Sequence, residues 1–313
     1  MLPQRGPFVK WTNGRGTLEG MARQRLLLTT RCVTIFHSSA YSILAIMMYP
    51  STTWRLVYSD PMDGATNMAI DEAILSAVRD DLALPTLRLY AWSPPCLSLG
   101  RRQPVSDVDW MALKAAGFDL VRRPTGGKAI LHTDELTYSV IVPQADPRAT
   151  GDVVESYRRL SLGLVQGLTQ LGVTGIVADR RASHRLEKPV CFEVPSDYEI
   201  TVKGRKLVGS AQMRSQSIVL QHGAIPLGGD IARICAYLTA RPDPVAVRAR
   251  ATTIADVLKR SVPWGEAAQA LAAGFAAALN ITWKEGTLTE VEWERANRLR
   301  AERYAHPTWT KRC

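Results

Sequence analysis

Hydrophobic and polar positions along the chain follow two periods, which predict short strands interspersed with amphipathic helices. Alternation of apolar and polar residues predicts strands at 54–58, 86–92, 96–100, 118–123, 136–142, 198–202, 206–213, 218–225 and 281–283. A period near 3.6 predicts helices at 67–78 (capped by Thr66 or Asn67), 106–117, 153–171, 264–279 and 289–303. Because successive strands are joined by short turns, we expect an α+β fold with a mixed, largely antiparallel sheet backed by helices.

Changes in composition and in the hydrophobic pattern divide the chain into three parts. Residues 1–50 are rich in Gly and Arg and contain an interrupted apolar run, so we expect an N-terminal extension that is disordered or lies upstream of a true start near Met47 or Met48. A transit-like or signal-anchor segment is the alternative. Residues 54–240 carry the strand-rich pattern of the main domain. Residues 241–313 become Ala-rich and charged, which predicts a small C-terminal helical subdomain after a Pro-containing linker.

Composition restricts the function classes. With 313 residues, 46% hydrophobic and 22% charged, the chain is long enough to bury an ordinary core. The net charge is +10, but half of it comes from the first fifty residues, and no base-reading motif is present, so we expect no nucleic-acid partner. Five cysteines without a Cys-x-x-Cys pair argue against a disulfide framework or a zinc site. We expect a cytoplasmic monomer that does not bind a membrane.

A cysteine and a lysine are placed so that they can form a nucleophile. Cys191 lies in a Pro-containing loop before one predicted strand, and Lys206 begins the next strand after a Lys-Gly turn. A thiol with an ordinary pKa near 8.5 needs a neighbouring cation to become an effective acyl-group nucleophile at neutral pH. We expect Lys206 to lower the pKa of Cys191 in this way. A small buried thiol without a catalytic role is the alternative.

A second constellation joins two predicted strands through a double glycine. The run Arg122 to His132 contains Pro-Thr-Gly-Gly-Lys, where glycines allow close backbone approach to a ligand and basic side chains supply positive charge. The Walker A spacing is missing, so the run is either a ligand loop or a sharp turn without a ligand. His132, His184 and His222 are candidate metal ligands or bases, but a histidine on a strand more often has a structural role. We expect no metal and no cofactor.

Three motifs in the same order resemble the biotin/lipoate A/B protein ligase catalytic-domain family. They are Arg-Arg-Pro-Thr-Gly-Gly, which leads to Asp-Glu-Leu-Thr-Tyr-Ser at 134–139, Lys-Leu-Val-Gly-Ser-Ala-Gln at 206–212, and Gln-His-Gly-Ala-Ile at 221–225. The Cys-Phe-x-x-Pro-Ser loop at 191–196 is most similar to the cysteine-dependent octanoyltransferases of this family. Lys128 and Asp134-Glu135 stand where the ATP-using ligases have a third glycine and Gly-Asn, which weakens an adenylate-forming interpretation.

The resemblance implies specific residue roles. Residues 54–240 would be the catalytic domain, with Cys191 as the acyl-thioester cysteine and Lys206 as the lysine that lowers its pKa. The implied substrate-binding residues line the two walls of an acyl pocket: Arg122, Arg123, Thr125, Gly126, Gly127, His132, Ser139, Gly209, Ser210, Ala211, Gln212, His222 and Gly223.

The resemblance also implies the reaction. Octanoate would pass from octanoyl-acyl carrier protein to Cys191, and then to a lysine of a lipoyl-domain protein such as the glycine cleavage H protein. Three alternatives remain: an ATP-dependent lipoate-protein ligase on the same fold, an octanoyl amidotransferase between lipoyl domains, and a carrier-binding relative without catalytic activity.

Overall fold

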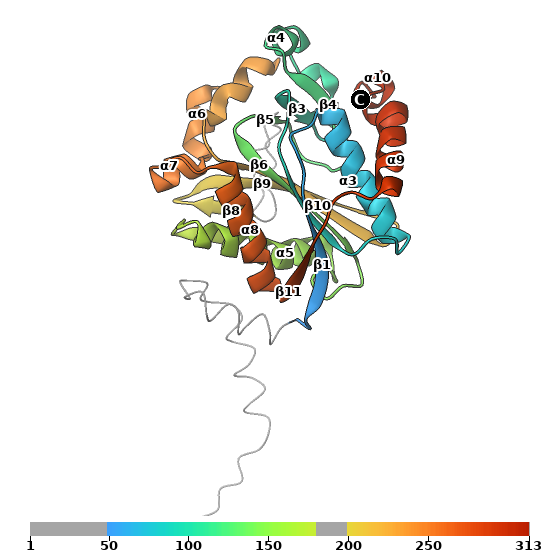
Figure 1. Cartoon of the computed structure of the whole chain (residues 1–313). Helices are drawn as coiled ribbons and strands as arrows, with labels where there is room; N and C mark the ends of the chain where they lie inside the picture. The colour runs from blue at the N-terminus through green and yellow to red at the C-terminus, as the bar shows by residue number, and fades with distance from the viewer. Residues whose placement is uncertain (1–48, 180–198, 313) are drawn as a thin grey trace, which may run out of the picture. The chain divides into compact units, whose positions relative to one another are not determined.

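The computed structural model describes residues 49–179 and 199–312. Within them, eight strands form one sheet in the order β11–β1–β2–β6–β10–β9–β8–β7 (Figure 1). The β11–β1 and β1–β2 pairs are parallel, and the other pairs in this sheet are antiparallel. This topology agrees with the expected α+β fold. The strands are β1 (Thr52–Tyr58), β2 (Thr86–Tyr90), β6 (Glu135–Pro143), β7 (Ile176–Asp179), β8 (Glu199–Val202), β9 (Arg205–Ser215), β10 (Ile218–Pro226) and β11 (Ile281–Glu285).

A second, three-stranded sheet carries the double-glycine turn. Strand β3 (Cys96–Leu99) is parallel to β4 (Asp119–Arg122) and antiparallel to β5 (Ile130–His132). A Cβ atom built on Gly100, directly after β3, would lie 1.9 Å from the carbonyl oxygen of Gly127. The turn therefore packs against the end of β3, and only a glycine at position 100 permits this approach.

Alternate side chains of β6 point into two separate cores. Leu136, Tyr138 and Val140 belong to the core beneath α5 (Val153–Gln170) and α8 (Trp264–Leu279). Ile141 belongs to the core beneath α3 (Gly64–Arg79) on the opposite face. The period of two along β6 thus gives the sheet two covered faces, and most of the strand is buried.

Helices α5 and α8 approach each other closely through glycines. A Cβ atom on Gly274 of α8 would lie 2.2 Å from the backbone nitrogen of Gly167 of α5. At Gly163, a Cβ atom would lie 2.6 Å from the ring of Phe275. A glycine inside a helix costs about 1 kcal/mol relative to alanine. Here that cost is offset by packing that no larger residue allows.

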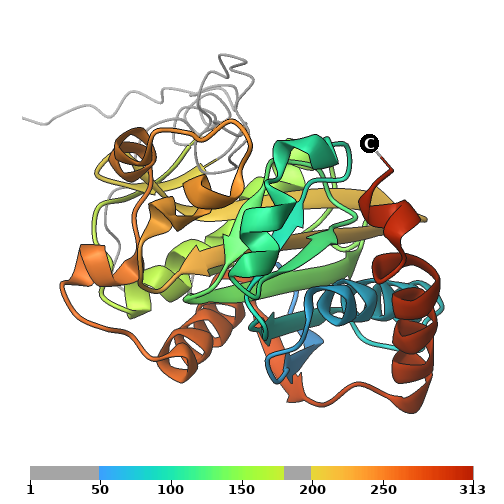
Figure 2. The same ribbon diagram turned by 90° about the horizontal axis from the view of Figure 1, so that it is seen from above.

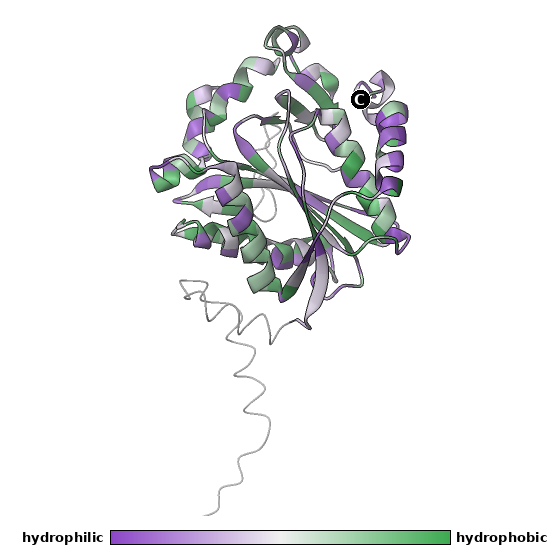
Figure 3. Cartoon of the chain, in the orientation of Figure 1, coloured by the Kyte–Doolittle hydropathy of each residue, from purple (hydrophilic) through white to green (hydrophobic). Residues whose placement is uncertain are grey.

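The C-terminal residues join the same sheet and cores. Strand β11 pairs with β1, and α9 (Glu290–Leu299) lies beside α3 in both Figure 1 and Figure 2. Helix α9 is largely hydrophilic (Figure 3), yet Glu292 is fully buried, where it accepts hydrogen bonds from Arg55 of β1 at 2.8 and 2.5 Å. A π-helical turn (Arg300–Tyr304) and α10 (Pro307–Thr310) follow. The separate subdomain expected from residue 241 onward stays a prediction, although its strand and helices contribute to the common core.

Several short elements differ from the sequence pattern. The cap of α3 is Asp63 rather than Thr66 or Asn67, because its carboxylate accepts from the Thr66 backbone N–H. The helix expected at 106–117 is a 3₁₀ turn, η1 (Val105–Asp107), followed by α4 (Trp110–Ala115). Elements too short to show a period were not expected: β5, β7, η2 (Ile231–Tyr237), α6 (Pro244–Arg250) and α7 (Ile254–Leu258). Among the described helices, none is both long enough and apolar enough to cross a membrane.

Candidate functional site

A β-bulge sets the direction of Lys206. Strands β8 and β9 form the expected hairpin, but Ile200 pairs with Val208 while Thr201 pairs with Lys206, so β9 has one extra residue, Leu207. Ile200 and Val208 are buried in the core beneath α5 and α8. Lys206 and Thr201 therefore lie on the opposite face of the sheet. Bulges re-aim side chains in this way and are frequent next to active sites.

The ammonium group of Lys206 is buried and ion-paired. Its Nζ atom lies 3.0 Å from Oε1 of Glu199, and each of the two side chains is only 5% exposed. The predicted partner Cys191 lies outside the described residues, as does His184. The proximity of Cys191 and Lys206 therefore stays a prediction.

A narrow cavity lies on the same face as Lys206. Beyond the bulge, Gly209 and Ala211 of β9 point to this face, and Ala211 is the direct cross-strand neighbour of His222 on β10. We call this cavity the slot. Its walls are mainly apolar or small residues with a few polar groups: Met68, Tyr90, Trp92, Ser98, Arg123, Ile130, His132, Thr137, Gly209, Ser210, Ala211, His222, Gly223 and Ala224.

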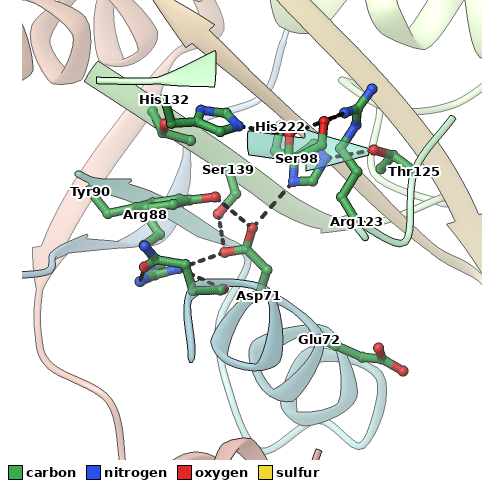
Figure 4. Close-up of polar contacts among 12 residues, drawn as sticks. Asp71, Glu72, Arg88, Tyr90, Ser98, Arg123, Thr125, His132, Ser139 and His222 are labelled. Carbon is green, nitrogen blue, oxygen red and sulfur yellow. Dashed lines mark hydrogen bonds and ion pairs between the residues drawn. The ribbon is translucent and has the colours of Figure 1, made fainter. Parts of the chain in front are cut away.

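One wall of the slot contains a buried carboxylate–imidazole–hydroxyl arrangement (Figure 4). Nδ1 of His222 lies 3.4 Å from Oδ2 of Asp71, and Nε2 of His222 lies 2.6 Å from Oγ1 of Thr125. Burial lowers the pKa of His222, with Asp71 opposing that shift and Arg123 and His132 reinforcing it. At neutral pH His222 is therefore uncharged, donating from Nδ1 to Asp71 and accepting at Nε2 from Thr125.

Asp71 is held by further donors on α3's side of the sheet. Arg88 and Ser139 donate to Oδ1, both at 2.9 Å, and the hydroxyl of Tyr90 donates to Oδ2 at 3.0 Å. Burial raises the pKa of Asp71, but the hydrogen bonds from His222 and Arg88 and the positive charge of Arg88 outweigh this effect and leave the pKa below its usual value. Asp71 is thus a fully buried anion whose hydrogen-bonding capacity is satisfied within the protein.

A second arrangement of the same type lies on the opposite wall. Nδ1 of His132 lies 2.6 Å from Oε1 of Glu135, and its Nε2 lies 2.8 Å from Oγ of Ser98. Arg123 donates to Ser98 Oγ at 3.1 Å and to the Ser98 carbonyl at 3.0 Å. The same guanidinium donates to the carbonyls of Gly126 and Lys128, at 2.8 and 2.7 Å. Arg123 therefore connects this wall to the glycine turn.

The ring of His132 is fixed by Trp92. The two rings are stacked with centroids 4.0 Å apart and planes 16° apart. Trp92 donates from Nε1 to Thr137 Oγ1 at 2.7 Å, and the Thr137 hydroxyl donates to Glu135 Oε1. Because the indole N–H can only donate, the direction of both hydrogen bonds, from Trp92 to Thr137 and from Thr137 to Glu135, is determined.

The guanidinium of Arg122 is bound by several backbone carbonyls. Its guanidinium donates to the carbonyls of Gly100 at 2.8 Å, Gln103 at 2.6 Å and Thr310 at 2.7 Å. Trp309 in turn donates from Nε1 to the Arg122 carbonyl at 2.8 Å. Arg122 is fully buried, and its bonds place it between the C-terminal segment and the loop that follows β3 rather than in the slot.

The structure brings together most of the predicted substrate-binding residues. Seven line the slot: Arg123, His132, Gly209, Ser210, Ala211, His222 and Gly223. Thr125 is hydrogen-bonded to His222, and Ser139 is hydrogen-bonded to Asp71, so both are connected to the slot indirectly. Gln212 lies on the other face, bonded to Gln221 and to Ser156 of α5. Gly126 and Gly127 are exposed.

Two carboxylates and one hydroxyl of the site, those of Asp71, Glu135 and Ser98, are not among the residues predicted from the sequence. Asn67 and Asp71 are four residues apart on α3, so two polar residues occupy its buried face. That break in the apolar pattern was the available signal for Asp71. Glu135 and Ser98 gave no signal of their own, because alternation along a strand is compatible with an exposed polar side chain.

A larger groove of ≈ 900 Å³ opens beside the slot. Glu135 lines this groove, and its partner His132 lines the slot, so the two spaces share one pair of side chains. The lining of the groove includes the aromatic residues Tyr58 and Trp264 and the acidic residues Asp60 and Asp134, with Arg233 as its basic side chain. In the part of the chain that the structure describes, no group of three His, Cys, Asp or Glu residues is arranged to hold a metal ion.

Comparisons with known proteins identify close sequence relatives. The lipoyl protein ligase A/B catalytic domain matches residues 63–276. Octanoyltransferase LipM of Kyrpidia tusciae is 43% identical over 272 residues, which cover 83% of this chain and 99% of that protein. Octanoyltransferase LipM of Moorella thermoacetica is 43% identical over 277 residues, covering 84% and 99%.

Solved structures agree with the fold. A lipoate-protein ligase A bound with ATP superposes with a TM-score of 0.70 at 26% identity, covering 83% of this chain and 99% of that one. A bi-partite lipoate protein ligase from Thermoplasma acidophilum gives a TM-score of 0.65 at 26% identity, covering 83% and 96%. The expected ligase-like α+β fold is confirmed.

Proposed function

Because the chain belongs to the lipoyl protein ligase A/B catalytic domain family, and octanoyltransferases are among its relatives at 36–43% identity, we propose that it is an octanoyltransferase. The donor is octanoyl-acyl carrier protein, and the acceptor is a lysine of a lipoyl-domain protein such as the glycine cleavage H protein. Cys191 carries the octanoyl group between them as a thioester.

The observation that carries this proposal is the position of Lys206. The bulge turns a buried ammonium onto the face of the slot, where Glu199 fixes its direction. A thiolate brought beside that cation is stabilised relative to the thiol, which is the requirement for nucleophilic attack on an acyl group. The ion pair with Glu199 offsets the cost of burying this ammonium.

The lining of the slot suits an unbranched acyl chain, since Gly209, Ala211 and Ala224 are small and Met68 and Ile130 supply apolar contacts. The volume of the slot is only ≈ 20 Å³, so its walls must move apart to admit such a chain. An apolar chain in this slot is removed from water, with a gain of about 0.8 kcal/mol for each buried CH₂ group. Longer side chains at these strand positions would fill the space.

The proposed reaction has two balanced steps. The Cys191 thiolate attacks the carbonyl carbon of the donor thioester, a new C–S bond forms, and the donor thiolate leaves. The amine of the acceptor lysine then attacks the acyl-enzyme, the C–S bond breaks, and an amide forms. Thioester exchange consumes no free energy source, so the reaction requires no ATP.

A lipoate-protein ligase activity is the second candidate, since the solved relatives with TM-scores of 0.65 and 0.70 are ligases. Incubating the enzyme with octanoyl-acyl carrier protein in the absence of ATP separates the two. We expect intact-mass spectrometry to show one octanoyl adduct, absent from Cys191→Ala, and transfer to the lipoyl domain without ATP. Product formation only with octanoate and ATP would favour the ligase, and normal transfer by Cys191→Ala would refute the covalent step.

A further inference from the structure

The two carboxylate–imidazole–hydroxyl arrangements differ in one respect, their access to solvent. Asp71 is fully buried, and its four partners come from within the protein. Glu135 lines the ≈ 900 Å³ groove and is hydrogen-bonded to His132, which lines the slot. A proton accepted inside the slot can therefore leave through Glu135, but it has no comparable exit through Asp71.

The hydrogen-bond directions leave an acceptor facing the slot. Glu135 is the common acceptor for the Thr137 hydroxyl and for Nδ1 of His132. In the neutral imidazole the proton lies on Nδ1, so Nε2 of His132 accepts from the Ser98 hydroxyl, while Ser98 Oγ accepts from Arg123. The remaining lone pair of Ser98 Oγ can accept a hydrogen bond from an N–H group in the slot.

We propose that Ser98, His132 and Glu135 form a proton relay that accepts a proton from the acceptor lysine amine during attack on the acyl-enzyme. This inference rests on the proposed acyl-transfer function and adds the residues that deprotonate the amine. Ser98 is the group that contacts the amine, and His132 and Glu135 act through it.

The acceptor lysine must lose a proton before it can attack, and the thioester itself supplies no group that accepts this proton. A lysine side chain has an ordinary pKa near 10.4, so at neutral pH it arrives as an ammonium without a free lone pair. Forming the amide releases two protons from this ammonium, of which the departing thiolate takes one. The other passes from nitrogen to Ser98 Oγ as the Ser98 proton moves to His132 Nε2, and the Nδ1 proton moves toward Glu135 and the groove.

The groove has the chemistry to receive the ammonium. The groove is lined by the carboxylates of Asp60, Asp134 and Glu135 and by one basic side chain, Arg233. The guanidinium of Arg233 lies 3.1 Å from the Asp134 carboxylate. Tyr58 and Trp264 add aromatic rings, which attract cations. The groove therefore attracts the incoming lysine before its amine reaches Ser98 in the slot.

The environment of His132 suits proton acceptance and release. Glu135 and Thr137 of β6 lie on its Nδ1 side, Ser98 of β3 on its Nε2 side, and Trp92 stacks on its face. The charged groups nearby are Glu135 and Arg123, and His222 is the other imidazole in the slot. A protonated His132 would be held by the Glu135 carboxylate until the proton departs.

The test separates the two half-reactions in a matched pair of variants. Ser98→Ala removes the hydroxyl of the relay, and Thr125→Val removes the corresponding hydroxyl beside His222. Each variant is first loaded with octanoyl-acyl carrier protein, and the adduct is followed by intact mass. The loaded enzyme is then mixed with a lipoyl domain or with hydroxylamine, a nucleophile that is already unprotonated at neutral pH.

We expect Ser98→Ala to load normally and to react normally with hydroxylamine, but to transfer to lysine roughly 10²- to 10⁴-fold more slowly. Its transfer rate should keep rising with pH toward the lysine pKa near 10.4, while the wild-type rate levels off earlier. Glu135→Gln should show the same selectivity. Equal losses with lysine and hydroxylamine, no loss, or the same selective loss in Thr125→Val would overturn the relay.

Failure of the proposed function gives a different result. In that case the wild-type enzyme forms no octanoyl adduct with the carrier thioester. If ATP and octanoate load the enzyme instead, the same lysine and hydroxylamine comparison applies to the acyl-adenylate, and the relay is judged on that result.

Discussion

Replacing Gly223 by alanine should displace the strand that carries Lys206. A Cβ atom at this position would lie 2.5 Å from the Gly209 carbonyl oxygen, 2.7 Å from Ser210 Oγ and 2.8 Å from a ring carbon of Tyr138. The Tyr138 ring is fully buried and bonded to Ser210 at 2.7 Å, so it has no free direction in which to move. Relief must come from separation of β9 and β10.

The size of the effect follows from these distances. Bringing the closest contact from 2.5 Å to an ordinary separation requires a shift of roughly 1 Å between two hydrogen-bonded strands. Overpacking of a filled core costs about 1–3 kcal/mol, and backbone clashes place Gly223→Ala near the upper end. For a domain of this size, a loss of about 3 kcal/mol lowers the Tm by roughly 6–12 °C.

The assay pairs thermal unfolding with the octanoyl-loading rate. We expect both to fall in Gly223→Ala, because Gly209 and Ala211 move with β9. Gly265→Ala is the control: nothing lies within 4 Å of its added Cβ atom, and its place in the first turn of α8 makes alanine neutral or slightly stabilising. A Gly223→Ala protein with wild-type Tm and loading rate would refute the reasoning.

Three further predictions concern packing and pH. Trp309→Ala should lower the free energy of unfolding by about 3–5 kcal/mol, measured in urea, because a large buried ring and its hydrogen bond to the Arg122 carbonyl are lost. It should also slow octanoyl loading, because Arg122 joins the C-terminal segment to the loop that follows β3. An unchanged loading rate would show that the C-terminal segment does not support this loop. Burial lowers the pKa of His222, so the contribution of this residue to the free energy of unfolding is complete above pH 6.5 and is lost as pH falls toward the folded-state pKa. At pH values below 6.5, the urea concentration at the unfolding midpoint should therefore decrease, and it should decrease less steeply in His222→Gln. Burial raises the pKa of Tyr138 to about 12, so the contribution of this residue to the free energy of unfolding is complete below pH 10 and is lost as pH rises from 10 to 12. Tyr138→Phe should remove this alkaline component, and an identical pH profile for the two proteins would contradict the assignment.

The sequence alone determined the features that depend on local pattern. Long amphipathic segments gave α5 and α8 nearly to the residue, and alternation gave most strands of the sheet. The Lys203-Gly204 turn fixed the β8–β9 hairpin, because both residues adopt the positive φ angles that such a two-residue turn requires. Short elements such as β5 and α7 carry too few residues to show a period.

Tertiary structure alone decided which polar residues form the site. Asp71, Ser98 and Glu135 come from α3, β3 and β6, and nothing in their local sequence indicates that they converge on two histidines. The direction of Lys206 depends on one extra residue in β9, which appears only when β9 is paired with β8. The guanidinium of Arg122 meets the carbonyl of Thr310, 188 positions away, a contact that its local motif does not indicate. Residue types and periods are local properties, whereas burial and hydrogen-bond partners arise from contacts between distant segments, so the first could be predicted here and the second could not.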